Sequence, residues 1–533
     1  KMIHRQNLIL VLTFFIFSAC NNFKKSSDKI SMNKKNQDEI KYRPQIHFSP
    51  RENWMNDPNG MFYYKGKYHL YFQHNPDANV WGPMHWGHAI SEDLVSWEQQ
   101  PIALFPDDLG TIFSGSAVVD LKNTSGFGTK ENPPIVAIYT NHNSREEKNG
   151  SKKFQNQSIA YSLDEGQTWT KYNQNPVIKN PGMIDFRDPK VFWYERQNKW
   201  VLTLAAGQQT QFYESKDLKN WSYLSSFGKG IGNHKGVWEC PDFFELPVEG
   251  SKETKWVHLV SINPGGPNGG SATQYFIGDF DGTNFLIDPY FEKQMKINHN
   301  FWTDFGKDNY AGVTYSNWES EKKGVLFQGW MSNWQYAGIV PTTTWRSAMT
   351  LPRELELFKS KKGLYRLRSK NINSFEKYTT QTIEKEKIDL NKNNILISEG
   401  KIDFSSAKVE LEIQNMNETK YNFILSNKNG DSLSFGYDHK EKLFFVDRSR
   451  TGNINFSKNF ALKPSIAPRI KKDGNLKMEF ILDKSSIELF YDDGISVMTE
   501  IFFSNSPYET LSLNCLGSGS SLKKFKLQEI KNE

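Results

Sequence analysis

Three acidic residues, Asp57, Asp188 and Glu239, stand in similar settings that suit the cleavage of a sugar linkage. Asp188 follows an arginine, Glu239 follows a tryptophan and Asp57 lies three positions after one. A proline follows each acid within two positions, which keeps the backbone out of a helix. A glycosidase needs two carboxyl groups, one as nucleophile and one as proton donor. An Asp-Pro turn beside a packed tryptophan would explain one such stretch, but three of them favour a catalytic site. The stretches read W-M-N-D-P-N-G from residue 54, F-R-D-P from 186 and W-E-C-P-D from 238.

These three motifs, in this order, resemble those of glycoside hydrolase family 32, the invertases, inulinases and levanases. The resemblance runs from about Tyr42 to the C-terminus. It implies that Asp57 attacks C2 of a fructosyl unit and that Glu239 is the acid/base. Asp188 would hold sugar hydroxyls and stabilise the transition state. A retaining mechanism predicts that the carboxyls of the nucleophile and the acid/base lie ~5–5.5 Å apart.

The sequence neighbours of the acids agree with these roles. The acid must keep its proton near neutral pH, and Glu239 has the apolar neighbours Trp238, Cys240 and Pro241, which favours the neutral form. Arg187 beside Asp188 should keep that carboxylate charged.

The family's fructose pocket matches further positions, and it contains no cofactor. His85 and His88 have the spacing of a metal pair but lack a third ligand, so we expect no metal site. The matched substrate-binding positions are Asn56, Gln73, Trp81, Phe113, Ser114, Arg187, Tyr310 and Trp330, with Trp334 as an alternative to Trp330.

A loose repeat indicates the elements that position these residues. A strand, a Ser-x-Asp turn and a tryptophan recur around Asp93, Asp164 and Asp217. The Ser and Asp side chains can bond turn amides, so we interpret these three aspartates as structural. Short strands in such repeats predict a β-propeller, and weaker echoes bring the count to about five blades.

The chain is therefore expected to be all-β, a five-bladed β-propeller followed by a C-terminal β-sandwich. Residues 42–365 would form the propeller, 366–384 a linker and 385–533 the sandwich, whose strands alternate and are separated by turn signals. One short stretch, Thr379 to Lys387, reads as helical.

The first residues read as an export signal. Residues 1–20 have a basic start, a short apolar run and a small-residue site that ends in Cys20, the pattern of a bacterial lipoprotein signal with lipid on Cys20. Residues 21–41 are polar and rich in lysine, as in a flexible tether. The formal charge of the chain is +6, but residues 1–41 account for +5 of it, so no nucleic-acid partner is expected.

The predicted function is an exported, membrane-anchored hydrolase of levan or inulin that releases terminal fructose. The three acids alone leave open an endo-acting levanase, a sucrose-directed invertase or fructosyltransferase, and a fructan-binding lipoprotein without turnover. An inverting five-bladed enzyme that acts on arabinan or xylan carries its carboxylates in other motifs. No long insertion plainly builds a groove for endo cutting, although residues 141–157 could contribute to one.

Overall fold

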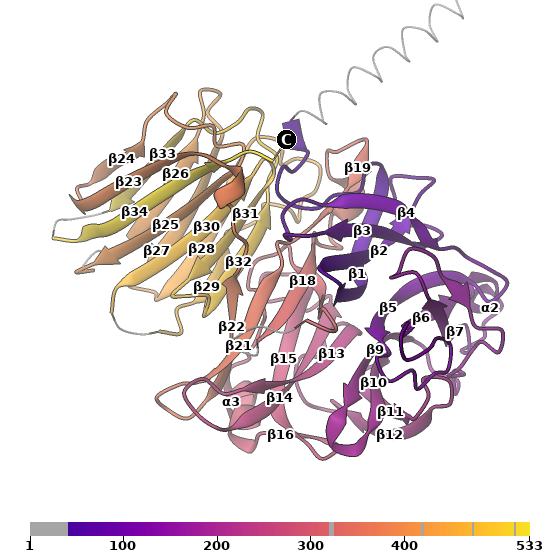
Figure 1. The fold of residues 1–533 in the computed structure, drawn as a ribbon. Helices are drawn as coiled ribbons and strands as arrows, with labels where there is room; N and C mark the ends of the chain where they lie inside the picture. Colours follow the sequence, from indigo (N-terminus) through magenta and orange to yellow (C-terminus); the bar gives the residue numbers. More distant parts are fainter. Residues whose placement is uncertain (1–40, 319–323, 417–419, 472–473, 516–518, 533) are drawn as a thin grey trace, which may run out of the picture.

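The computed structural model describes residues 41–532 except 319–323, 417–419, 472–473 and 516–518. The described chain is all-β and contains seven sheets, in two groups (Figure 1). Short helices join some strands, among them α2 (Ser144–Lys148) and α3 (Pro289–Ile297). No helix within the described ranges is long and apolar enough to cross a membrane.

Residues 53–371 form five sheets, which are antiparallel except where β19 joins the first one and are otherwise made of strands that lie close together in the chain. The first holds β1 (Asn53–Tyr64), β2 (Lys67–Asn75), β3 (His85–Ser91) and β4 (Glu98–Leu104), and β19 (Trp345–Arg346) pairs with β1 in parallel. The second holds β5 (Thr111–Val119), β6 (Ile135–His142), β7 (Gln155–Ser162) and β8 (Thr170–Lys171). The third holds β9 (Phe186–Tyr194), β10 (Lys199–Ala206), β11 (Thr210–Ser215) and β12 (Ser222–Phe227).

The fourth sheet holds β13 (Val237–Pro247), β14 (Thr254–Asn263), β15 (Ala272–Phe280) and β16 (Phe285–Ile287). The fifth holds β17 (Tyr310–Thr314), β18 (Val325–Met331), β20 (Ala348–Met349), β21 (Arg353–Lys359) and β22 (Tyr365–Asn371). The first strands contact one another in a closed cycle, β1 with β5, β5 with β9, β9 with β13, β13 with β17 and β17 with β1. The five sheets therefore form a ring around their first strands (Figure 1).

The first strand of each of these five sheets carries a β-bulge near its start. In β1 the register shifts between Met55 and Pro58, where three residue steps face two steps on β2. A bulge bends its strand and re-aims a side chain, so the five bulges direct side chains out of the ladders at one end of the ring. The other shifts lie between Ile112 and Gly115, Arg187 and Lys190, Glu239 and Asp242, and Tyr310 and Val313.

The repeated Ser-x-Asp turns are structural, as the sequence predicts. Oδ1 of Asp217 accepts hydrogen bonds from the backbone N–H groups of Lys219 and Asn220, at 3.0 and 2.8 Å. Asp93 and Asp164 bond turn amides in the same way. None of the three lines the pocket that contains the catalytic candidates.

The remaining strands form two six-stranded sheets of a β-sandwich. Ring stacking joins the sheets across their core: the centroids of Phe444 and Tyr491 lie 3.8 Å apart. One sheet, in spatial order, holds β23 (Thr379–Asp389), β34 (Ser521–Ile530), β25 (Ala407–Gln414), β30 (Leu476–Asp483), β31 (Ser486–Tyr491) and β32 (Ser496–Ile501). The other holds β24 (Asn393–Ile397), β33 (Thr510–Cys515), β26 (Lys420–Ser426), β27 (Ser432–Asp438), β28 (Leu443–Arg450) and β29 (Ser465–Pro468).

Two expectations for the junction are wrong. The stretch predicted as a helix, Thr379 to Lys387, lies in strand β23, because pairing with β34 outweighs the helix propensity of its Glu and Lys residues. The predicted linker, 366–384, is mostly strand: β22 continues to Asn371 and β23 begins at Thr379. Only a short connection with a 3₁₀ turn lies between them.

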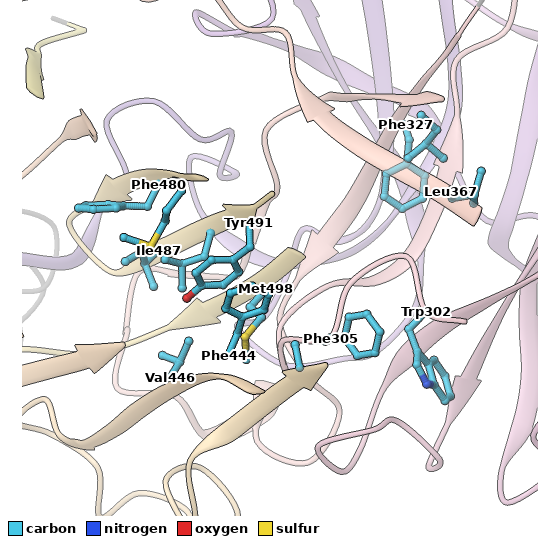
Figure 2. Close-up of a cluster of buried hydrophobic side chains, with 14 of the residues drawn as sticks. Trp302, Phe305, Phe327, Leu367, Phe444, Val446, Phe480, Ile487, Tyr491 and Met498 are labelled. Carbon is cyan, nitrogen blue, oxygen red and sulfur yellow. The ribbon is translucent and has the colours of Figure 1, made fainter. Parts of the chain in front are cut away.

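A continuous hydrophobic cluster joins the ring to the sandwich (Figure 2). It contains Trp302, Phe305 and Phe327 of the ring and residues such as Tyr491 and Met498 of the sandwich. A large apolar interface of this kind opposes relative motion of two domains. The ring and the sandwich are therefore held as one body, and the rim of the ring remote from the sandwich carries α2 (Figure 1).

Candidate active site

A pocket of about 320 Å³ opens where the bulges of β1, β5, β9 and β13 meet. It contains all three of the acids that the motifs single out. A larger hollow of about 680 Å³, between the β3–β4 turn and the N-terminal segment, contains none of them. The pocket is lined by Asn56, Asp57, Gln73, Trp81, Phe113, Ser114, His142, Glu147, Phe154, Gln155, Ile184, Asp185, Arg187, Asp188, Glu239 and Trp334.

The bulges explain how strands that are otherwise regular present these acids. Asp57 lies within the bulge of β1, Asp188 within that of β9, and Glu239 directly before that of β13. Asp188 and Cys240 have positive φ values, 64° and 45°, which are rare for residues with a side chain. The prolines after Asp57, Asp188 and Cys240 have no N–H to lose from the ladder, so they suit such positions.

Asp57 is held by three donors. Ser114 Oγ donates to Oδ2 at 2.6 Å, Asn56 Nδ2 to Oδ1 at 3.0 Å, and Cys240 Sγ to Oδ2 at 3.3 Å. Asn56 is itself fixed by Trp54 Nε1, at 2.8 Å. Burial raises the pKa of Asp57, opposed by the bond from Ser114.

Asp188 lies beside Asp57 and shares the Cys240 thiol with it. The backbone N–H of Cys240 donates to Oδ2 of Asp188 at 3.0 Å, and Sγ lies 3.6 Å from the same oxygen. Arg187 Nε is 3.7 Å away. Burial raises the pKa of Asp188 to about 7, more than Arg187 lowers it, and the charges of Glu239 and Asp57 raise it further. Arg187 thus favours the charged form of Asp188, as its place in the sequence predicts, but burial opposes it.

Arg187 joins the third acid to this network. Its Nη2 donates to Oε1 of Glu239 at 3.0 Å, and its Nη1 donates to Asp185. Tyr310 donates its hydroxyl to Oε2 of Glu239. Burial lowers the pKa of Arg187, but the carboxylates of Glu239, Asp188 and Asp185 outweigh it and hold the pKa above its usual value. Glu239 is the more accessible acid, with 23% of its side chain exposed against 5% for Asp188.

Comparison with known proteins identifies this arrangement. The model of the glycosyl hydrolases family 32 N-terminal domain matches residues 47–367, and that of the family's C-terminal domain matches residues 367–529. The chain belongs to glycoside hydrolase family 32. It is therefore a glycoside hydrolase of the β-fructofuranosidase type.

Individual relatives of family 32 extend over both domains. A levanase of Bacillus subtilis is 46% identical over 493 residues, which span 92% of this chain and 70% of that protein. An exo-inulinase structure from Aspergillus awamori has a TM-score of 0.81 at 34% identity and covers 92% of this chain and 99% of its own. A fructofuranosidase of Schwanniomyces occidentalis, solved with fructosylnystose, has a TM-score of 0.82 at 35% identity, with coverage of 92% and 98%.

Most positions matched to the family 32 fructose pocket lie at this pocket, but two do not line it. Trp330 is completely buried, packed behind Trp54 and Trp334, and Trp334 takes the place at the pocket. Tyr310 is 1% exposed and acts on the pocket through Glu239. The matched residues that do line the pocket are Asn56, Gln73, Trp81, Phe113, Ser114 and Arg187.

Several lining residues escaped the sequence reasoning. His142, Glu147, Phe154 and Gln155 come from the end of β6, from α2 and from the approach to β7, and we call them the β6–β7 wall. The one available signal was the polar composition of residues 141–157. This composition pointed to the segment as a whole, but it did not single out His142, Glu147 or any other residue in it.

The two histidines with metal-like spacing have other contacts. His88 Nε2 lies 3.1 Å from Nδ1 of His69, and its ring stacks on Tyr71. His85 lies beside Phe105 and the carbonyl of Pro83. No group of three or more His, Cys, Asp or Glu side chains in the described part of the chain could hold a metal ion.

Proposed function

We propose that this enzyme hydrolyses the β-fructosidic bonds of fructans, levan or inulin, with retention of configuration and release of terminal fructose. The observation that carries the proposal is the single network of hydrogen bonds and ion pairs that joins Asp57, Asp188 and Glu239 in one small pocket. Relatives named levanase and exo-inulinase support the substrate class.

In the first step Asp57 attacks C2 of the fructosyl unit, and the C2–O bond to the leaving group breaks. Glu239 gives its proton to the departing oxygen. In the second step Glu239 takes a proton from water, whose oxygen bonds C2 and frees the carboxylate of Asp57. Glu239 suits the proton transfers because 23% of its side chain is exposed, so water can reach it.

Asp188 holds hydroxyls of the terminal ring in this scheme. Its place between Arg187 and the Cys240 N–H fixes the carboxylate against Asp57. As positive charge develops at the ring carbon and oxygen, the two neighbouring carboxylates stabilise it. With a pKa of about 7, Asp188 can also hold a proton in the empty pocket and so limit repulsion within the cluster.

The size of the pocket favours exo cutting. Ligand pockets usually measure ~300–1,000 Å³, and this one lies at the small end of that range. The aromatic side chains Trp81, Phe113 and Trp334 stand beside the polar groups, as walls around one ring. An endo enzyme also needs subsites beyond the attacked ring, on that ring's own side of the cleaved bond, because the chain continues there.

Chromatography of early time points on levan and on inulin tests the proposal. Free fructose should be the first and main product from at least one polymer. A ladder of fructo-oligosaccharides ahead of fructose would refute exo cutting. Faster turnover of sucrose than of either polymer would point to an invertase, and fructosyl transfer at high sucrose to a fructosyltransferase. Absence of any released sugar would leave only fructan binding.

The domain organisation and location are part of the proposal. The five sheets of the ring serve as the blades of a five-bladed β-propeller, which the closed cycle of first strands supports. Cys20, which lies outside the described residues, would carry the lipid of an exported protein, and relatives named extracellular agree with export. Replacing Cys20 with Ala should abolish the incorporation of labelled fatty acid; a wild-type protein without label would refute the anchor.

A further inference from the structure

The β6–β7 wall extends the active-site pocket beyond the residues that the proposed mechanism uses. It belongs to the connection between β6 and β7, on the side of the ring remote from the sandwich (Figure 1). His142, the last residue of β6, pairs with Thr111 at the start of β5 and with Gln155 at the start of β7. The wall therefore starts in the sheet whose bulge supplies Ser114.

Hydrogen bonds fix the direction of the His142 ring. The side-chain oxygen of Gln155, Oε1, accepts a hydrogen bond from the backbone N–H of Phe186 at 2.9 Å. The side-chain nitrogen, Nε2, is therefore the atom that faces His142 Nδ1, at 3.3 Å. That nitrogen can only donate, so Nδ1 accepts. Nε2 then carries the proton and donates to Oε2 of Glu147 at 3.1 Å. A chain of hydrogen bonds thus runs from β9, the strand that bears Arg187 and Asp188, through Gln155 and His142 to Glu147.

Aromatic packing holds the same ring from both sides. His142 stacks on Phe113, with centroids 4.2 Å apart and planes 5° from parallel, and Phe154 meets it edge-on at 5.4 Å. Burial is the main cause of the lowered pKa of His142, against the effect of Glu147, and Arg187 lowers it further. His142 is therefore a neutral donor locked between two aromatic rings.

Glu147 is the exposed end of this arrangement. Its side chain is 49% exposed and lines the pocket, whereas that of His142 is 7% exposed. Its second oxygen, Oε1, accepts no hydrogen bond from the described residues. A carboxylate held by one oxygen, with the other facing a pocket, is prepared to accept hydroxyl groups.

The exposure of the carboxylates that line the pocket increases from the groups around the terminal ring toward the wall. The side chain of Asp188 is 5% exposed, that of Glu239, the proton donor to the leaving group, is 23% exposed, and that of Glu147 is 49% exposed. The terminal ring occupies the polar groups around Asp57 and Asp188, so the next ring must lie outward of Glu239. Glu147 is a carboxylate on the pocket lining in that outward region.

We propose that Glu147, positioned by His142, binds hydroxyls of the sugar on the leaving-group side of the cleaved bond. Its ligand is thus the second fructosyl residue of a fructan chain. This inference rests on the proposed function. It makes the β6–β7 wall the part of the pocket that selects a fructan chain over a substrate with a small leaving group. His142 is a positioning residue: it fixes Glu147 before the sugar arrives, which lowers the entropic cost of binding.

The test compares a difructose, levanbiose or inulobiose, with methyl β-D-fructofuranoside, which has no sugar in the leaving-group position. The measured quantity is the ratio of kcat/KM for the difructose to kcat/KM for the methyl fructoside. Glu147→Ala should lower this ratio by about 10-fold, the value of a hydrogen bond to a charged group. Glu147→Gln keeps an acceptor and should lower it by about 3-fold. An unchanged ratio in Glu147→Ala would overturn the proposal.

Two further variants control the comparison. Glu146→Gln removes a carboxylate from the same helix that does not line the pocket, and it should keep the wild-type ratio. His142→Phe keeps the aromatic packing but loses both hydrogen bonds, and the ratio should fall about 3-fold. If Glu147→Ala lowers the ratio and His142→Phe does not, the positioning role is wrong.

The proposed function can fail separately. A wild-type enzyme that releases no fructose from the difructose, levan or inulin would refute fructan hydrolysis. The same variants measured with sucrose against methyl fructoside would then decide whether Glu147 binds a leaving-group sugar: a fall in that ratio supports it, and a constant ratio overturns it.

Discussion

Two groups of buried charges in this protein have opposite character. One is the pocket, where Asp188 and Glu239 share Arg187 and Asp57 has only uncharged donors. The other lies between the ring and the sandwich, where Glu488 accepts from His47 Nε2 at 2.9 Å and from Arg353 Nη2 at 2.6 Å. Its remaining acids are matched too: Asp483 bonds His47 and backbone amides, and Asp304 bonds Arg353.

The pKa values show the contrast. Burial acts against the charged form of Glu488, but Arg353 and His47 outweigh it and lower the pKa to about 2. Burial also lowers the pKa of His47, yet its two carboxylates raise it to about 9. For Asp188 burial prevails, and the pKa rises to about 7. The interface gives its three acids two cations and fixed donors, whereas the pocket gives its three acids one cation and so leaves more negative charge for the reaction.

The largest expected effect is a loss of catalysis without a loss of stability. Asp57→Ala and Glu239→Ala should each lower kcat by about 10⁴-fold, while the melting temperature stays at or above that of the wild type. Azide, or a substrate with a good leaving group, should restore turnover to Glu239→Ala, where only proton transfer is lost. Wild-type rates in Glu239→Ala would refute the acid/base assignment.

The interface should behave in the opposite way. Glu488→Gln leaves buried cations without their carboxylate, so the free energy of unfolding should fall by about 3–5 kcal/mol, with kcat per folded molecule retained. Denaturant melts and active-site titration measure the two quantities. As a control, Glu386→Gln on the exposed face of β23 should change stability by less than about 0.5 kcal/mol. A Glu488→Gln protein as stable as the wild type would remove the contrast.

Asp188→Asn should stabilise the fold while it disables the enzyme. The pKa of Asp188 is raised from 3.8 to about 7, so its ionisation costs stability as pH rises from about 4 to 7. At pH 8 the variant should unfold with about 2–4 kcal/mol more free energy than the wild type, and the gain should disappear near pH 4. Melting temperatures across this range, with kcat beside them, check the result. A variant less stable than the wild type at pH 8 would contradict the argument.

The smallest effect belongs to His47. Because its pKa is raised from 6.5 to about 9, its contribution to stability is complete below pH 6.5 and is lost as pH rises through 9. Wild type and Asp188→Asn should therefore both lose about 1–2 kcal/mol between pH 7.5 and 9.5. If the melting temperatures of the two proteins fall in parallel over this pH range, His47 and Asp188 affect stability in separate pH windows. A stability that stays constant over this interval would count against the role of His47.

The sequence carried most of the information about the acids but little about what surrounds them. Asp57, Asp188 and Glu239 stand in local motifs, so their types and neighbours are visible in the chain. The thiol of Cys240 between Asp57 and Asp188 is not, because it depends on β1, β9 and β13 meeting at their bulges. The rise of the Asp188 pKa has the same origin, since burial is a property of the assembled ring.

The errors have similar causes. Trp330 lies on β18 and Trp334 in the turn four residues later, and both pack against Trp54, so only the assembled ring decides which of them reaches the pocket. Thr379 to Lys387 has a helical composition, but its pairing partner β34 lies more than a hundred residues away. Glu147 sits in a polar connection whose composition resembles any exposed loop, and its contact with His142 could not be read from either residue.

The five aligned bulges make the pocket modular. Each is stabilised within its own sheet, so a substitution at Asp188, Cys240 or the corresponding Ala311 changes what faces the centre without rebuilding the strand. The backbone already has a positive φ at all three positions. New chemistry in this ring can therefore arise one residue at a time at these three equivalent places, in a frame that each sheet maintains by itself.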